Sequence, residues 1–195
     1  MIKFFRQNGS VLLLLALICF TAIFSEWAGA ILEYQRPAIF AGQYYRLLTA
    51  HLVHTNFNHA LMNLVGLLLI WSIAFRYISL RDWWLTLLLS AVVVSVGLVL
   101  FNPDIQWYRG LSGVLHGLLF VVILKARQLP GILKFVALLG LVIKIVLEQT
   151  QTGLWQSEQL IGAVVIVDAH LYGLIGGLVS YVVIRQLKSD KMFYH

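Results

Sequence analysis

The chain contains few charged residues. Only 11% of its 195 residues are Asp, Glu, Lys or Arg, whereas about 25% is usual for soluble domains. It has one cysteine, Cys19, so an internal disulfide is excluded, and its three prolines leave long stretches without a helix breaker. Hydrophobic residues make up 61% of the sequence. This balance excludes an ordinary soluble domain and indicates a polytopic membrane protein.

Long apolar runs fill most of the chain. A hydrocarbon core about 30 Å thick needs about 20 apolar residues for each crossing helix. We therefore predict an all-α membrane protein with one domain over residues 1–195. Its six spans are expected at about 11–32, 58–77, 83–101, 112–126, 131–148 and 160–184. The connection 33–57 is too long for a simple turn, and loops of that length are often functional.

The first apolar run has two interpretations. Lys3 and Arg6 precede the stretch 11–24, and Ala28-Gly29-Ala30 follows it, a pattern that resembles a secretory signal with its cleavage site. Alternatively, residues 11–32 form a retained first span, since they are long enough to cross the membrane. We favour the retained helix. A mature N-terminus near Ile31, found by mass spectrometry, would contradict it.

Basic residues lie mainly on one side of the predicted spans. The opposite side has only Arg36, Arg46 and Arg109, while Lys144 lies within the fifth span. Lys and Arg concentrate in cytoplasmic loops, so we predict that both termini are cytoplasmic. The net charge of +6 is then a topology signal and not a nucleic-acid surface. The larger group comprises Lys3, Arg6, Arg76, Arg81, Lys125, Arg127, Lys134, Arg185, Lys188 and Lys191.

Four polar residues are predicted to lie at one depth in the membrane. Ser112, His170, His59 and Asn63 belong to the second, fourth and sixth spans, which all run in the same direction. Counted from the basic residues that end those spans, they stand about 20–25 Å above the cytoplasmic edge at a rise of about 1.5 Å per residue. That level is below the outer surface of a core about 30 Å thick. Their common depth indicates a site.

The residue types at this depth fit nucleophilic catalysis. A serine hydroxyl needs a base to take its proton, and histidine titrates near neutral pH. We therefore predict Ser112 as nucleophile and His170 as base. His59 and Asn63 are spaced i, i+4 and share a helix face. They are candidate donors to an oxyanion, together with the backbone N–H of Ser112 at the start of a helix.

Glycine spacing predicts that the fourth and sixth spans touch. Gly113 and Gly117 are four residues apart, as are Gly173 and Gly177. Such pairs of small residues let membrane helices approach closely, which would bring the serine and histidine within bonding distance. The fourth span is short, so residues 102–111 should dip into the membrane, where irregular backbone is tolerated only inside protein or beside water.

These residues give the chain a resemblance to the rhomboid family of intramembrane serine proteases over residues 44–183. In that family the serine is the nucleophile and the histidine the base. The positions of His59 and Asn63 help to form the oxyanion hole, and the loop that holds the arginine is structural. One departure is Tyr44-Tyr45-Arg46, where a Trp-Arg pair is frequent. The matching motifs are Arg46-Leu47-Leu48-Thr49, His54, His59, Asn63, Gly110-Leu111-Ser112-Gly113, Ala169-His170, Gly173 and Gly177.

A narrower resemblance is to the rhombosortase branch of that family. Rhombosortases are thought to process bacterial proteins that end in Gly-Gly, a transmembrane helix and a basic tail. The resemblance implies a bacterial inner-membrane protein whose active site opens toward the periplasm. It rests on the segment from Gly110 to Gly117, on Glu148-Gln149 following Lys144, and on Asp168-Ala169-His170-Leu171-Tyr172-Gly173.

Other polar residues near the predicted site have open roles. His116 lies one helical turn after Ser112, where it either orders water or substrate or is a buried hydrogen-bonding residue. Lys144 and Glu148 are spaced i, i+4 and should pair, and a contact with substrate is a further hypothesis for them and for His54. Asp168 lies two residues before His170 and points away from it on a helix, so we predict a Ser–His dyad and not a triad.

Other functional classes fit less well. A catalytically inactive relative that binds membrane helices would usually lack the serine or the histidine. A transporter would show an inverted repeat or broken helices, and neither is visible in the sequence. A zinc peptidase is disfavoured because His54 and His59 are not in a His-Glu-x-x-His arrangement. We expect no metal or other cofactor, and as partners single-span membrane proteins and the lipid bilayer, but no nucleic acid.

Overall fold

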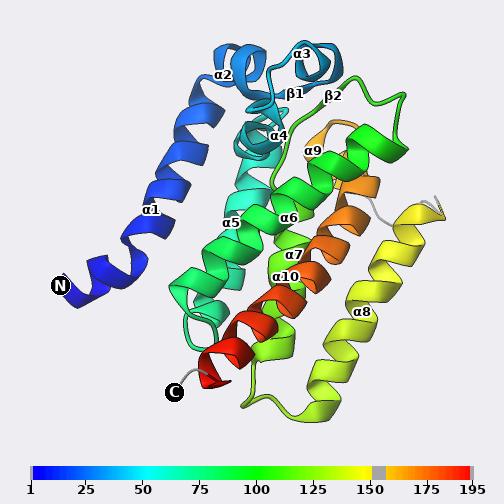
Figure 1. Ribbon diagram of the computed structural model, residues 1–195. Helices are drawn as coiled ribbons and strands as arrows, with labels where there is room; N and C mark the ends of the chain where they lie inside the picture. Colours follow the sequence, from blue (N-terminus) through cyan, green and yellow to red (C-terminus); the bar gives the residue numbers. More distant parts are fainter. Residues whose placement is uncertain (1, 151–156, 194–195) are drawn as a thin grey trace.

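The computed structural model of the chain describes residues 2–150 and 157–193 and is predominantly helical (Figure 1). Two strands of two residues, β1 (Tyr34–Gln35) and β2 (Trp107–Tyr108), pair antiparallel, a small exception to the all-α prediction. The helices are α1 (Ile2–Ile23), α2 (Ser25–Leu32), α3 (Arg36–Phe40), α4 (Arg46–Thr49), the 3-10 turn η1 (Ala50–Leu52), α5 (Phe57–Ala74), α6 (Leu80–Phe101), α7 (Ser112–Lys125), α8 (Gly131–Gln149), α9 (Ser157–Ile161) and α10 (Asp168–Phe193).

Within the described residues, α5 and α6 are long and apolar enough to cross a membrane. The segments Asn8–Ile23 and Ser25–Leu32 qualify together as a third, bent span, and α7 is a shorter apolar helix. The chain is thus a multi-pass membrane protein. The number of six spans and the cytoplasmic position of both termini remain predictions.

Two of the expected spans have other boundaries. The run 11–32 is not one helix, because the chain bends by 108° between α1 and α2. Phe24, with φ −104° and ψ 43°, leaves helical geometry, and Glu26 lies in the first turn of α2, where an acid is favourable. The run 160–184 is also divided. Gly162, with φ +70°, ends α9 as glycine commonly does, and α10 begins only at Asp168.

The centre of the bundle is α7, which packs against α5, α6 and α10. One apolar cluster joins α7 to α1, α5 and α6 and includes Ile18, Leu67, Trp83 and Leu118, all fully buried. The helix α8 lies at the edge of the bundle (Figure 1). The N-terminal end of α7, where Ser112 lies, is therefore enclosed by other helices, and α8 lies on one side of it.

The backbones of α7 and α10 are in direct contact at glycines. A Cβ atom placed on Gly173 would overlap the Gly113 carbonyl, and one placed on Gly177 would lie 2.6 Å from the Gly117 carbonyl oxygen. Gly117 in turn faces the Gly173 carbonyl oxygen. No side chain fits between these helices, so the small residues set their separation.

We expect Gly173→Ala to lower the free energy of unfolding by about 3 kcal/mol, because an added methyl must force α7 and α10 apart. Gly140→Ala is the matched control, since nothing lies within 4 Å of a Cβ at this helical glycine. It should change stability by about 1 kcal/mol or less. Unfolding in mixed micelles measures both variants, and equal effects would contradict the close approach.

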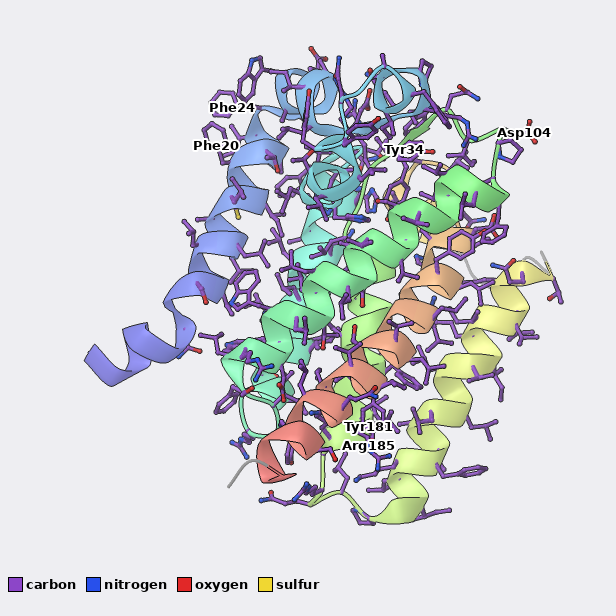
Figure 2. The ribbon with its side chains drawn as sticks, in the orientation of Figure 1. Phe20, Phe24, Tyr34, Asp104, Tyr181 and Arg185 are labelled. Atoms are coloured by element: carbon purple, nitrogen blue, oxygen red, sulfur yellow. The ribbon has the colours of Figure 1, made fainter. Side chains whose placement is uncertain are left out.

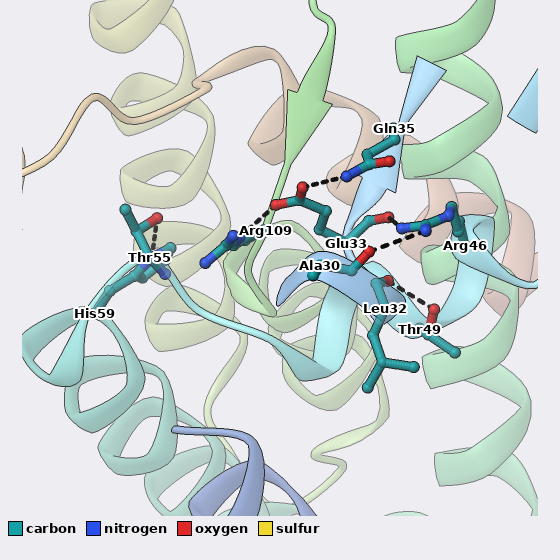
Figure 3. A network of polar contacts seen from close by, with 9 residues as sticks. All are labelled: Ala30, Leu32, Glu33, Gln35, Arg46, Thr49, Thr55, His59 and Arg109. Atoms are coloured by element: carbon teal, nitrogen blue, oxygen red, sulfur yellow. Dashed lines mark hydrogen bonds and ion pairs between the residues drawn. The ribbon is translucent and has the colours of Figure 1, made fainter. Parts of the chain in front are cut away.

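The long connection between α2 and α5 is held by a buried arginine (Figure 3). Arg46 is 5% exposed and donates to the carbonyl oxygens of Glu33 (2.9 Å) and Ala30 (3.0 Å) and to the Gln43 side chain (2.7 Å). The Glu33 carboxylate also pairs with Arg109 at 2.6 Å. These contacts connect the loop to the segment that precedes Ser112.

The loop contacts gather at one end of the bundle. Tyr34 and Asp104 lie at that end, whereas Tyr181 and Arg185 of α10 lie at the other (Figure 2). Tyr34 is fully buried and aligns with Tyr108 in the short β1–β2 pair. Since Tyr108 is only four residues before Ser112 in the sequence, these loop contacts fix the entry of the chain into α7.

Candidate active site

Ser112 is the first residue of α7 and lies two residues after a glycine with positive φ. Gly110 has φ +133°, a conformation that L side chains rarely adopt. Its N–H donates to the Ala50 carbonyl at 3.1 Å, and its carbonyl accepts from the Tyr108 hydroxyl at 2.7 Å. The His59 ring packs so closely that a Cβ on Gly110 would lie 2.8 Å from its Cε1. Only glycine fits here, and it presents the hydroxyl of Ser112 at the helix start.

His51 and Tyr108 hold this turn and were not singled out from the sequence. The His51 ring nitrogens lie 3.3 Å from the Gly110 carbonyl oxygen and 3.1 Å from the Ala91 carbonyl oxygen. Burial lowers the pKa of His51 to about 4 and raises the pKa of Tyr108, so both are neutral at pH 7. His51 lies in the single 3-10 turn η1 and Tyr108 in a two-residue strand, and elements this short have no periodicity that reveals which way a side chain faces.

His170 meets Ser112 from the first turn of α10. Its Nε2 lies 2.9 Å from the Ser112 Oγ, and its side chain is almost fully buried. The approach depends on the glycine contact, because a Cβ on Gly113 would lie 2.5 Å from the carbonyl oxygen of Ala169, the residue before His170. The structure thus brings the predicted nucleophile and base to hydrogen-bond distance.

Glu148 extends this pair into a longer chain of contacts. Its Oε1 pairs with Lys144 Nζ at 2.5 Å, as the i, i+4 spacing predicted. Its Oε2 lies 2.9 Å from His170 Nδ1, which the predicted Ser–His dyad omits. Asp168 faces away from His170 and accepts from Asn102 Nδ2 at 2.7 Å. In the sequence, Glu148 stood out as an ionisable residue within a predicted span, which is a functional candidate by default, and as part of the Lys144 and Glu148-Gln149 motif. Neither signal pointed to His170.

His116 packs directly on the base. Its ring stacks on His170 with centroids 4.3 Å apart and an angle of 22°. Its Nδ1 is 2.7 Å from the Ser112 carbonyl oxygen, one turn earlier on α7. The ring therefore limits the rotation of the His170 imidazole, and it also lines the cavity described below.

His59 and Asn63 lie beside Ser112, whereas His54 is set back from it. Asn63 Nδ2 donates to the His59 carbonyl at 2.9 Å, which leaves its second N–H for another acceptor. His54 is 1% exposed, and neither ring nitrogen has a hydrogen-bond partner among the described residues. Its ring lies edge-on to His59 at 5.0 Å, and burial lowers its pKa to about 3. His54 therefore packs behind His59 as a neutral ring.

A cavity of about 200 Å³ is lined by Ser112, His170, Glu148 and their neighbours. Its volume accommodates a short stretch of extended peptide with small side chains rather than an intact helix, whose diameter is about 10–12 Å. Apolar residues from α5, α7, α9 and the following loop complete its wall. The lining residues are His59, Met62, Asn63, Ser112, Leu115, His116, Lys144, Glu148, Ile161, Val165 and His170.

The same residues include one group with metal-ligand chemistry. Ligand atoms of His116, Glu148 and His170 lie within 4.8 Å of one another. The Glu148 carboxylate, however, is already bonded to the Lys144 ammonium, whose positive charge opposes a cation at this point. His116 Nδ1 is also engaged with a backbone carbonyl. The arrangement fits proton transfer between Ser112 and His170 better than it fits metal coordination.

The chain matches a known family over most of its length. Residues 41–187 fit the family model described as Rhomboid domain. This range contains Ser112, His170, Glu148 and every residue that lines the cavity. No curated protein matches the chain.

Proposed function

The chain belongs to the rhomboid family of intramembrane serine proteases, and from this premise we propose that it is an intramembrane serine endopeptidase with Ser112 as nucleophile and His170 as base. The observation that carries the proposal is the 2.9 Å contact between His170 Nε2 and Ser112 Oγ. Both side chains line one cavity in a protein built from apolar helices. A hydroxyl paired with an imidazole in such a cavity is the arrangement that acyl transfer requires.

The geometry supports a two-step hydrolysis. Ser112 Oγ attacks the carbonyl carbon of the scissile peptide while its proton passes to His170 Nε2. The tetrahedral intermediate collapses, the C–N bond breaks, and His170 returns the proton to the leaving amine. Water then attacks the acyl-enzyme with the same histidine as base, which releases the new carboxyl end and restores the Ser112 hydroxyl.

We expect three donors to stabilise the oxyanion. The backbone N–H of Ser112 is free for this role because it lies at the N-terminus of α7, where the first N–H groups have no partner within the helix. Asn63 and His59 line the same cavity from α5. Donors fixed before the reaction stabilise the developing charge without reorganisation.

The substrate class follows from the rhombosortase resemblance and from the small cavity. We propose that the enzyme resides in the bacterial inner membrane with both termini cytoplasmic. Its proposed substrates are proteins that end in Gly-Gly, a transmembrane helix and a basic tail, and it cleaves them near the periplasmic end of that helix. Two glycines each cost a helix about 1 kcal/mol relative to alanine, so the segment unwinds readily. They also carry no side chain that must enter the cavity of about 200 Å³.

Co-expression with a substrate of this kind tests the specificity. We expect the wild type to shorten the substrate and Ser112→Ala to leave it intact. In the matched control the substrate's Gly-Gly is replaced by Leu-Leu, which should reduce processing at least tenfold. Equal processing of both substrates would make the protein a rhomboid protease of other specificity. Processing that persists in Ser112→Ala would contradict the catalytic proposal, and no processing of any membrane substrate would favour a helix-binding relative.

A further inference from the structure

We propose that Glu148 is a positioning residue that fixes the tautomer of His170 and stabilises its protonated form without taking up the proton, so that the site operates as a Ser–His–Glu triad with Lys144 as counter-ion. The inference rests on the proposed function and adds a third side chain to the pair that the family resemblance implies. Glu148 and Lys144 both belong to α8, so the proposal gives this helix a role in catalysis although it contributes neither the nucleophile nor the base.

Both carboxylate oxygens of Glu148 are engaged, each by a different partner. Oε2 lies 2.9 Å from His170 Nδ1, and Oε1 lies 2.5 Å from Lys144 Nζ. The Glu148 side chain is only 3% exposed. An isolated buried carboxylate is costly, whereas one with an ion pair and a second hydrogen bond is tolerated. Lys144 therefore allows Glu148 to remain ionised beside the imidazole.

The contact determines where the proton of His170 lies. An ionised carboxylate only accepts hydrogen bonds, so Nδ1 must carry the hydrogen that it donates to Glu148. In the neutral ring Nε2 then has the lone pair, and it faces Ser112 Oγ at 2.9 Å. This is the tautomer that can remove the serine proton. The stacked ring of His116 holds the plane of the imidazole while Glu148 fixes its proton.

The carboxylate also faces the charge that forms during the reaction. When Ser112 attacks, His170 becomes a cation, and the nearest negative group is Glu148. The pair is removed from water, where opposite charges attract more strongly than at a surface. In Ser–His–Asp proteases the equivalent acid orients the histidine and stabilises its cation without taking up the proton.

Glu148→Gln tests whether the charge of the carboxylate and its control of the His170 tautomer matter, because it keeps the size and shape of the side chain. The substituted amide keeps the size of the side chain but has only one oxygen. Lys144 can only donate, so it should take that oxygen and leave the amide NH₂ facing Nδ1. The imidazole proton must then move to Nε2, where it blocks attack. We expect kcat to fall about 10⁴-fold, as for the matching change in Ser–His–Asp proteases, with KM little changed.

The double variant Lys144→Met/Glu148→Gln distinguishes positioning from a structural role. Without the ammonium, the amide can turn its oxygen to Nδ1–H and restore the productive tautomer. We expect the double variant to react at least tenfold faster than Glu148→Gln alone. A residue that only supports packing would give the opposite order, because the second substitution removes a further contact. A double variant equal to or slower than Glu148→Gln would overturn the proposal.

The rate constant of fluorophosphonate labelling, measured on monodisperse detergent-solubilised protein, provides the assay independently of substrate binding. Asp168→Asn is the matched control, since it removes an acid two residues from His170 that bonds to Asn102 instead, and its labelling rate should equal that of the wild type. Labelling of the wild type and of Glu148→Gln at equal rates would refute the role of Glu148 and leave the proposed function intact. Absence of labelling in the wild type would refute both.

Discussion

Ser112→Ala is expected to lower the rate of substrate cleavage by about 10⁶-fold, and His170→Ala should lower it as much. In serine proteases the nucleophile and base act as one unit, so that removing either costs about as much as removing both. The 2.9 Å contact between Oγ and Nε2 predicts the same coupling here. The double variant Ser112→Ala/His170→Ala should therefore be no slower than either single variant.

Ser72→Ala is the matched serine control for this experiment. Ser72 is exposed on α5, its hydroxyl donates to the Leu69 carbonyl of its own helix at 2.7 Å, and it is not among the residues that line the cavity. Its substitution should leave the cleavage rate within a factor of two. Cleavage rates are measured in detergent or liposomes with a single-span substrate. If the losses in cleavage rate from Ser112→Ala and His170→Ala multiply in the double variant, the two residues act independently. That result would contradict the transfer of a proton between them.

Asn63→Ala should reduce kcat about 10²- to 10³-fold, which is the cost of removing one oxyanion donor in a serine protease. The effect should fall on kcat and not on KM, because the bond forms only when charge develops on the carbonyl oxygen. Asn63 donates one N–H to the His59 carbonyl, so its amide is already oriented before the substrate binds.

Asn63→Asp provides a second variant with the same shape. A carboxylate has no N–H to offer and repels the oxyanion, so its kcat should be at least as low as that of Asn63→Ala. A variant that raises KM with unchanged kcat would assign Asn63 to substrate binding and not to oxyanion stabilisation. Circular dichroism and size-exclusion profiles establish that both proteins are folded.

The sequence was sufficient to predict that Ser112 and His170 would meet, because depth and spacing are properties of single helices. Ser112 and His170 were placed at one level by counting along their own spans, and the glycines four residues apart predicted the contact of α7 with α10. Those arguments need only the rise of a helix and the size of its side chains. The family model over residues 41–187 agrees with the resemblance to the rhomboid family, whereas the rhombosortase branch stays a proposal.

The contact of Glu148 with His170 could not be predicted in the same way. Spacing shows that Glu148 faces Lys144 on α8, but the rotation of α8 about its axis depends on its packing against α7 and α10. The bend at Phe24 was missed for a related reason. Apolar residues continue through it from α1 into α2, so that hydrophobicity alone indicates one span. The packing of Arg109 against Gly29 of α2 joins residues far apart in the sequence, and hydrophobicity does not reveal such a contact.

We propose that His170 makes Ser112 nucleophilic inside the apolar bundle. Intact-mass analysis of the membrane-extracted protein after treatment with a fluorophosphonate tests it most directly, with peptide mapping of the adduct. We expect one adduct, located on Ser112, which is lost in Ser112→Ala and formed far more slowly in His170→Ala. An adduct on another residue, or labelling of Ser112 that is unchanged in His170→Ala, would contradict it.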